Sequence, residues 1–251
     1  MESIEKLIPN FFFILLRAGI VIMMLPFFST QNLPPQFKIG VAVALSLVLA
    51  PVVNFSVPSA SIPSVVLNEV LFGMILGLAA RFIFFAVDMA GHLMSASTGM
   101  SMATAFNPDI GPSSELSNLY SIITMLLFLA MDVHHDLLAV FVKSYEWVPL
   151  GTMNAGGLVN AGVSFATKIF IVALKLSAPV VIIMLVTNVL LGFIYKAAPQ
   201  MNVFFVGYPV YLFLGFLIMM LSLPVFAYVM GGYFAGIKDE MGRVMLLMKG
   251  S

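Results

Sequence analysis

The stretch from Val203 to Ile237 contains no charged residue, and as an α-helix it would be about 50 Å long. The hydrocarbon core of a bilayer is only about 30 Å thick. Tilt absorbs part of the excess, and Pro224 or Gly231–Gly232 is predicted to break the helix. A helix that stays apolar well beyond the bilayer thickness is best covered by other protein subunits. The sequence therefore predicts an integral membrane protein in an obligate assembly.

The composition agrees with membrane insertion. Of the 251 residues, 61% are hydrophobic and 9% are charged, whereas a soluble domain carries about 25% charged residues. Eleven basic residues balance eleven acidic ones, so no basic excess points to nucleic acid. The absence of cysteine excludes disulfides, thiolate metal sites and cysteine nucleophiles. No nucleotide-binding or hydrolase motif occurs, and we expect neither an enzyme nor a cofactor.

Hydrophobic runs predict an all-α, multi-pass chain of about six long, partly broken helices. The first run, Phe11–Phe28, is expected to remain in the protein, because MESIEK is acidic and no cleavage pattern follows it. No linker or repeat divides the chain, so we treat residues 1–251 as a single membrane domain. The other predicted runs are Ile39–Val53, Val65–Val87, Leu116–Val142, Val163–Tyr195 and Val203–Ile237.

A polar interruption lies near the middle of the chain, from Ser95 to Asn118. Polar, non-helical backbone at membrane depth requires burial by protein or a water-filled space. Small residues recur every four positions from Gly91, which predicts a tightly packed helix to Ala105. Asn-Pro and Gly-Pro steps then break the chain. The residues alone leave open whether this break lines a pore or is an exposed connector. The break comprises Phe106, Asn107, Pro108, Asp109, Ile110, Gly111, Pro112, Ser113 and Ser114.

Four charged residues lie inside the apolar runs: Arg17, Glu69, Arg81 and Asp88. Charges inside a membrane are costly and are usually paired or functional. They fit a proton or ion path, or ion pairs that fix the helix register between subunits. We favour ion pairs, because no cluster of acidic residues or pair of broken helices surrounds these positions.

Gly73 and Gly77 form a G-x-x-x-G pair within the run Val65–Val87. Small residues at this spacing let two helix backbones approach closely in an apolar environment. We expect both glycines at a helix–helix contact.

The sequence MDVHHD contains Asp132, His134, His135 and Asp136. Adjacent histidines on a regular helix point apart, whereas a metal-binding pair usually has the spacing i, i+4. Only Asp132 and Asp136 would share a face. The sequence favours a polar helix end at the membrane surface, and no metal site is expected.

The segment from Leu190 to Tyr211 reads LLGFIYKAAPQMNVFFVGYPVY. It resembles the FliR family of flagellar type III export-gate proteins and its injectisome relatives, and Ala197–Pro209 is the most specific part. Other segments of the chain match further motifs of the family in the same order, among them N-E-x-L-x-G-x-x-x-G at Asn68–Gly77. The resemblance therefore covers nearly the whole chain. One departure is Lys196, where the family is expected to carry arginine.

The resemblance implies a subunit of the flagellar basal body in the bacterial inner membrane. Its partners would be FliP-like and FliQ-like gate subunits, an FlhB-like switch protein, membrane lipid and unfolded export substrates. Residues 1–150 would be FliP-like, and residues 160–237 would form a FliQ-like helical hairpin. The resemblance also favours the break at Phe106–Ser114 as a plug across the closed pore.

The turn YKAAPQMN is predicted to join the two last helices, either as a plain hairpin turn or as a contact with the switch protein. Its candidate contact residues are Lys196, Pro199, Gln200 and Asn202. The residues alone are also compatible with two other functions. One is a proton-coupled secondary transporter of a small solute, with Glu69 and Asp88 as the relay. The other is a scaffold without a pore.

Overall fold

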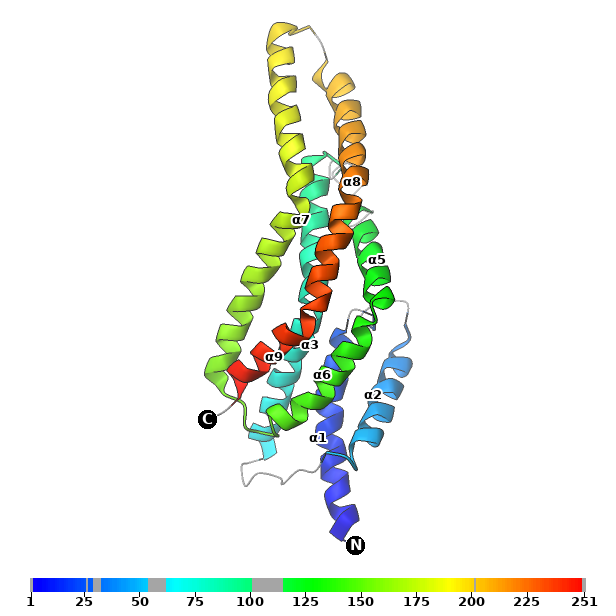
Figure 1. Ribbon diagram of the computed structural model, residues 1–251, viewed down its shortest axis with the longest axis vertical. Helices are drawn as coiled ribbons and strands as arrows, with labels where there is room; N and C mark the ends of the chain where they lie inside the picture. Colours follow the sequence, from blue (N-terminus) through cyan, green and yellow to red (C-terminus); the bar gives the residue numbers. More distant parts are fainter. Residues whose placement is uncertain are drawn as a thin grey trace. The chain divides into compact units, whose positions relative to one another are not determined.

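The computed structural model describes residues 2–25, 27–28, 33–53, 62–100, 115–200 and 202–249, without the side chains of residues 2–8, 155, 203 and 204. Over this part the regular structure is helical, apart from one isolated antiparallel bridge between Met153 and Lys249. The predicted all-α membrane fold is confirmed. The helices in Figure 1 are α1 (Glu2–Met24), α2 (Pro35–Leu49), α3 (Ile62–Ser97), α5 (Glu115–Ala130), α6 (Val133–Trp147), α7 (Ala155–Ala197), α8 (Val203–Ala235) and α9 (Ile237–Met248).

Not every apolar helix is long enough to cross a membrane. Among the described residues, α3, α7 and α8 are, and the broken pair α5–α6 is a fourth candidate. The apolar parts of α1 and α2, Pro9–Met24 and Pro35–Leu49, are shorter. Counting α5–α6 as one broken helix, the described chain has six apolar helices, but only three or four are candidate spans.

The third predicted run and the helix predicted from Gly91 are one continuous helix, α3. The prediction for Gly91–Ala105 holds as far as Ser97. A turn then follows, in which Gly99 has a φ of +76°. This left-handed conformation suits glycine, which has no Cβ to clash with the neighbouring carbonyl. The rest of that prediction lies outside the described residues.

The predicted break in the last long helix is wrong. Helix α8 passes through Pro209, Pro224 and Gly231–Gly232 and ends at Ala235. Helix α7 likewise contains Pro179. Membrane helices tolerate proline because neighbouring helices and hydroxyl side chains satisfy the freed backbone groups. Helical structure therefore continues through the prolines of α7 and α8.

The predicted single helix over Leu116–Val142 is also wrong, because Asp132 separates α5 from α6. This residue has a φ of +55°, a left-handed conformation that does not continue a right-handed helix. The helix then restarts at Val133, and the His135 N–H donates to the Asp132 carbonyl at 3.0 Å. Neither glycine nor proline marks this break in the sequence.

The chain forms two compact units, and α3, α5, α7 and α8 each contribute to both, α8 with only its last two residues in unit 1. In unit 1, α1 lies beside α2, and α6 packs against α9. Unit 2 contains the hairpin of α7 and α8, whose ends meet at a short connection (Figure 1). Unit 1 comprises Met1–Phe82, Phe128–Thr167 and Phe234–Ser251, and unit 2 comprises Ile83–Leu127 and Lys168–Tyr233.

Candidate functional site

A buried ion pair connects α1 and α3 in unit 1. The Arg17 guanidinium donates Nε to Glu69 Oε2 at 2.7 Å and Nη2 to Glu69 Oε1 at 3.0 Å. Its Nη1 donates to the backbone carbonyl and the hydroxyl of Ser144 at 3.1 and 3.2 Å, and its Nη2 also donates to the Val148 carbonyl at 3.1 Å. All five N–H donors of the guanidinium are thus used.

Two aromatic rings flank the same guanidinium. The Arg17 Cζ lies 4.4 Å from the ring centroids of both Phe72 and Tyr145. Both contacts are cation–π interactions. Arginine can combine them with a planar pair of hydrogen bonds to one carboxylate, which lysine does not reproduce. The Tyr145 hydroxyl donates to the Ile14 carbonyl at 3.3 Å, which ties α6 back to α1.

The carboxylate side of the pair is supported by the chain after α6. The Gly151 N–H donates to Glu69 Oε1 at 3.4 Å, and Asn68 Nδ2 donates to the Gly151 carbonyl at 3.1 Å. Gly151 has a φ of +74°, a conformation that suits glycine. The cluster therefore fastens α1, α3, α6 and the connection to α7 together.

These contacts concern the two roles that the sequence left open for Arg17 and Glu69. The ion pair exists, but it fixes helix register within one chain, so the expectation of a pair between subunits is wrong for these two residues. Ser144 and Val148, which complete it, follow Arg17 by more than a hundred positions, and no local pattern marks them as its partners.

Arg81 and Asp88 lie in different units and differ in solvent exposure. Arg81 is half-buried in unit 1. In unit 2, Asp88 is exposed, accepts a hydrogen bond from the Ser117 hydroxyl, and lies 3.8 Å from His92 Nε2.

Gly73 and Gly77 lie at a close contact between α3 and α1 of the same chain. A Cβ atom at Gly73 would lie 3.3 Å from Ile20 Cβ, and one at Gly77 would lie 2.7 Å from Met24 Cβ. The two glycines let α3 approach α1 one turn and two turns beyond the buried ion pair. Close packing and the ion pair thus act on the same two helices.

The predicted plug, Phe106–Ser114, lies outside the described residues. The helices on either side of it are described. A Cβ at Gly91 of α3 would overlap the backbone of Ser117 of α5, and one at Gly215 of α8 would lie 2.6 Å from Thr98 Cγ2. Within unit 2, both ends of the undescribed segment are thus packed against a neighbouring helix.

The turn YKAAPQMN joins α7 to α8, as predicted. Its candidate contact residues Lys196, Pro199, Gln200 and Asn202 are all exposed. A Cβ at Gly207 would lie 2.6 Å from the Tyr195 hydroxyl, so the two helices approach closely near the turn.

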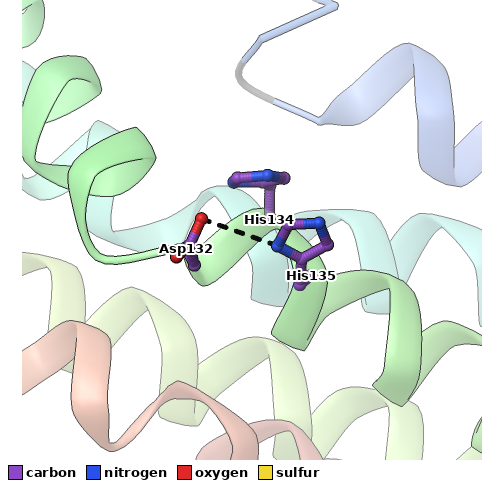
Figure 2. Close-up of side chains that lie close together, drawn as sticks. All are labelled: Asp132, His134 and His135. Carbon is purple, nitrogen blue, oxygen red and sulfur yellow. Dashed lines mark ion pairs between the residues drawn. The ribbon is translucent and has the colours of Figure 1, made fainter.

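Asp132, His134 and His135 lie at the start of α6, and Figure 2 shows their side chains near one another. The expectation that the adjacent histidines point apart is wrong, because their ring centroids are 4.1 Å apart. Asp136 instead forms an ion pair with Lys238 of α9 at 2.6 Å.

Comparison with known proteins identifies the family. The chain matches the sequence pattern of bacterial export proteins, family 1, over residues 8–237. It belongs to this family. The flagellar biosynthetic protein FliR of Caulobacter vibrioides is 30% identical over 220 residues, which cover 85% of this chain and 88% of the relative. The FliR protein of Bacillus subtilis is 28% identical over 257 residues, which cover 99% of each chain.

The predicted resemblance is confirmed, and it extends to a third relative. The FliR protein of Escherichia coli is 28% identical over 230 residues, which cover 86% of this chain and 85% of the relative. This chain is thus an all-α membrane protein of the bacterial export family, whose named relatives are flagellar biosynthetic proteins.

Proposed function

We propose that this chain is a non-enzymatic core subunit of the flagellar type III export gate in the bacterial inner membrane, at the basal body. Together with FliP-like and FliQ-like subunits it would form the channel for unfolded flagellar proteins. Membership of the export family over residues 8–237 carries this proposal. Residues 1–150 would be the FliP-like part, and residues 160–237 the FliQ-like hairpin.

The exposed apolar surface of the hairpin supports an assembly. In the most apolar 18-residue part of α8, only 17% is buried within the chain, against 56% for α3. Helix α7 has 43 residues, which corresponds to about 65 Å of helix against about 30 Å of hydrocarbon. Lipid alone does not cover such a length, so partner helices would cover the remainder.

The segment Phe106–Ser114 would plug the closed pore. Phe106 and Ile110 would fill the lumen, while Gly111 and the prolines let the backbone fold back. The packing of Gly91 against Ser117 and of Gly215 against Thr98 supports this role, because a plug needs fixed ends.

Deletion of Asn107–Ser113 tests the plug. The complex containing this chain is reconstituted in liposomes, and the ion conductance of the closed gate is measured. Replacement of the same residues by a glycine–serine linker of equal length keeps the connection but removes the side chains. Both variants should raise the ion leak. If both variants co-purify with the gate partners and conduct no more than the wild type, the plug is wrong.

A small-solute transporter is the second candidate, and the geometry gives it less support. Glu69, one member of its proposed proton relay, is held by two hydrogen bonds from Arg17 and one from Gly151. These hydrogen bonds hold the Glu69 carboxylate in one position, whereas a proton relay needs a group that can change partners. Purification distinguishes the two: a large hetero-oligomer supports the gate, and a single active subunit supports transport.

A further inference from the structure

The break between α5 and α6 brings together three side chains that a regular helix would separate. The possible ligand atoms of Asp132, His134 and His135 all lie within 4.8 Å of one another. Asp132 Oδ1 is 3.6 Å from His135 Nδ1, the pair joined by the dashed line in Figure 2. We propose that these three residues bind a divalent cation such as Zn²⁺, Co²⁺ or Ni²⁺.

The donor set selects the type of cation. Imidazole nitrogen suits Zn²⁺, Co²⁺ and Ni²⁺, whereas Mg²⁺ and Ca²⁺ prefer ligand sets made of oxygen atoms. Two imidazoles and one carboxylate supply three ligands, which leaves a fourth position of a tetrahedral site for water or a group from a partner. The chain contains no cysteine that would compete as a thiolate ligand.

The backbone conformation of Asp132 explains why helical spacing does not predict its position relative to the histidines. Asp132 precedes α6 at its N-cap, in a left-handed conformation, and its carboxylate makes no capping hydrogen bond. An aspartate at an N-cap ordinarily accepts a hydrogen bond from the backbone N–H of the first turn. Here the carboxylate lies toward His135 instead. Helical spacing therefore does not describe the relation between Asp132 and the two histidines.

An independent observation on His134 points to a ligand. Its Nδ1 is buried and has no hydrogen-bond partner among the described residues. Buried polar nitrogens in native structures are ordinarily satisfied, and each exception calls for an explanation. A cation coordinated at this nitrogen would supply the missing partner.

The distances between the possible ligand atoms are close to those required to coordinate one cation. Two ligand atoms of tetrahedral Zn²⁺ are about 3.3 Å apart, given metal–ligand distances of about 2.0–2.1 Å. The separation of 3.6 Å between Asp132 and His135 is already close to this value. Both side chains are largely exposed, at 74% and 68%, so they can rotate toward His134 without displacing the core.

The neighbouring acidic residue does not belong to the site. Asp136 Oδ1 lies 2.6 Å from Lys238 Nζ, which engages that carboxylate with α9. The cation would instead bind Asp132, which precedes α6, and two residues of the first turn of α6, so it would brace the break between α5 and α6. This proposal is independent of the export-gate function.

Cobalt binding tests the site. The full-length chain is purified in detergent with an affinity tag that contains no histidine, and it is titrated with Co²⁺ while the visible absorption of the ion is recorded. One equivalent should bind with a tetrahedral spectrum. His134→Gln, His135→Gln and Asp132→Asn should each weaken binding by at least about tenfold, since even the outer-shell partners of metal ligands contribute 10–100-fold.

The third histidine of the chain provides the matched control. His92 lies on α3 beside Asp88, and His92→Gln should leave Co²⁺ binding unchanged. If wild type binds no Co²⁺, or if His92→Gln and His135→Gln lose binding equally, the proposal is wrong. Acylation of histidine in the wild-type chain needs no variant to fold: Zn²⁺ should protect His134 and His135 and leave His92 reactive. Equal modification of all three with and without Zn²⁺ would also overturn the site.

Discussion

Arg17 and Glu69 face each other through two hydrogen bonds, of 2.7 and 3.0 Å, with side chains that are 0% and 2% exposed. Taking two charges out of water is costly, and the attraction between them repays that cost only with good geometry and full hydrogen bonding. Here both conditions hold, because the guanidinium donates all five N–H groups. The pair therefore has a defined geometry, and its loss should weaken the packing among α1, α3 and α6.

Arg17→Leu should destabilise unit 1 by about 3–5 kcal/mol, because it leaves Glu69 buried without a counter-charge. The free energy of unfolding in detergent measures this effect. The double variant Arg17→Leu with Glu69→Leu removes both charges and should recover much of the loss, since apolar replacement of a whole buried pair is often neutral. A double variant no more stable than Arg17→Leu would contradict this account.

Gly77→Ala should destabilise the contact of α1 with α3 by about 1–3 kcal/mol, the usual cost of overpacking. The new methyl group would lie 2.7 Å from Met24 Cβ, which cannot move without its helix. Gly19→Ala is the matched control, because a Cβ there meets nothing within 4 Å. This control should instead gain about 0.5–1 kcal/mol from helix propensity. Equal effects of the two substitutions would show that the close approach is unimportant.

Gly91→Ala should loosen one end of the segment that we propose as the plug. Its methyl group would lie 2.7 Å from the Ser117 backbone nitrogen, so α3 and α5 would have to separate. The reconstituted gate should then leak ions in its closed state. Gly192→Ala on α7 has open space at its Cβ and should leave the leak unchanged. A tight gate with Gly91→Ala would argue against anchoring of the plug by this contact.

Lys196→Glu should reduce export and weaken binding of the FlhB-like switch protein, if the exposed turn between α7 and α8 contacts that protein. Because Lys196 is exposed, charge reversal should not affect folding. Co-purification of the gate with the switch protein measures the contact directly. Lys249→Glu, another exposed lysine outside the turn, serves as the comparison. Normal export and co-purification with Lys196→Glu would leave the turn as a plain connection.

Lys238→Gln should cost less than about 1 kcal/mol of stability, because exposed ion pairs contribute little. The Lys238 and Asp136 side chains are 53% and 33% exposed, so water competes with their short contact. Thermal unfolding in low and high salt should give nearly the same midpoint for the variant, whereas wild type should lose a little stability in high salt. A loss as large as that of Arg17→Leu would mean that the membrane environment shields this pair.

The sequence predicted those features of the fold that depend on regular spacing or on apolar length. The long hairpin of α7 and α8 and the packing of Gly73 and Gly77 belong to this group. The sequence does not predict the continuity of α8 through Pro224, because the rule that proline breaks a helix comes from soluble proteins. In membrane helices, neighbouring helices and hydroxyl side chains satisfy the backbone groups that proline frees.

The candidate site was harder to predict than the fold. Arg17 and Glu69 could be singled out as costly charges, but Ser144 and Val148 join them only through tertiary packing. The grouping of Asp132 with His134 and His135 depends on one left-handed residue, which neither glycine nor proline announces. Non-glycine residues adopt that conformation rarely, so local patterns give it little weight.

The division of the chain into units has a consequence for biogenesis. Unit 1 combines α1 and α2 with α9, and the Asn154 N–H is bonded to the Met248 carbonyl at 3.0 Å. Insertion into the membrane proceeds from the N-terminus, yet unit 1 cannot close until α9 has been synthesised. Helices α1 and α2, which are synthesised first, thus belong to a compact unit that α9 completes.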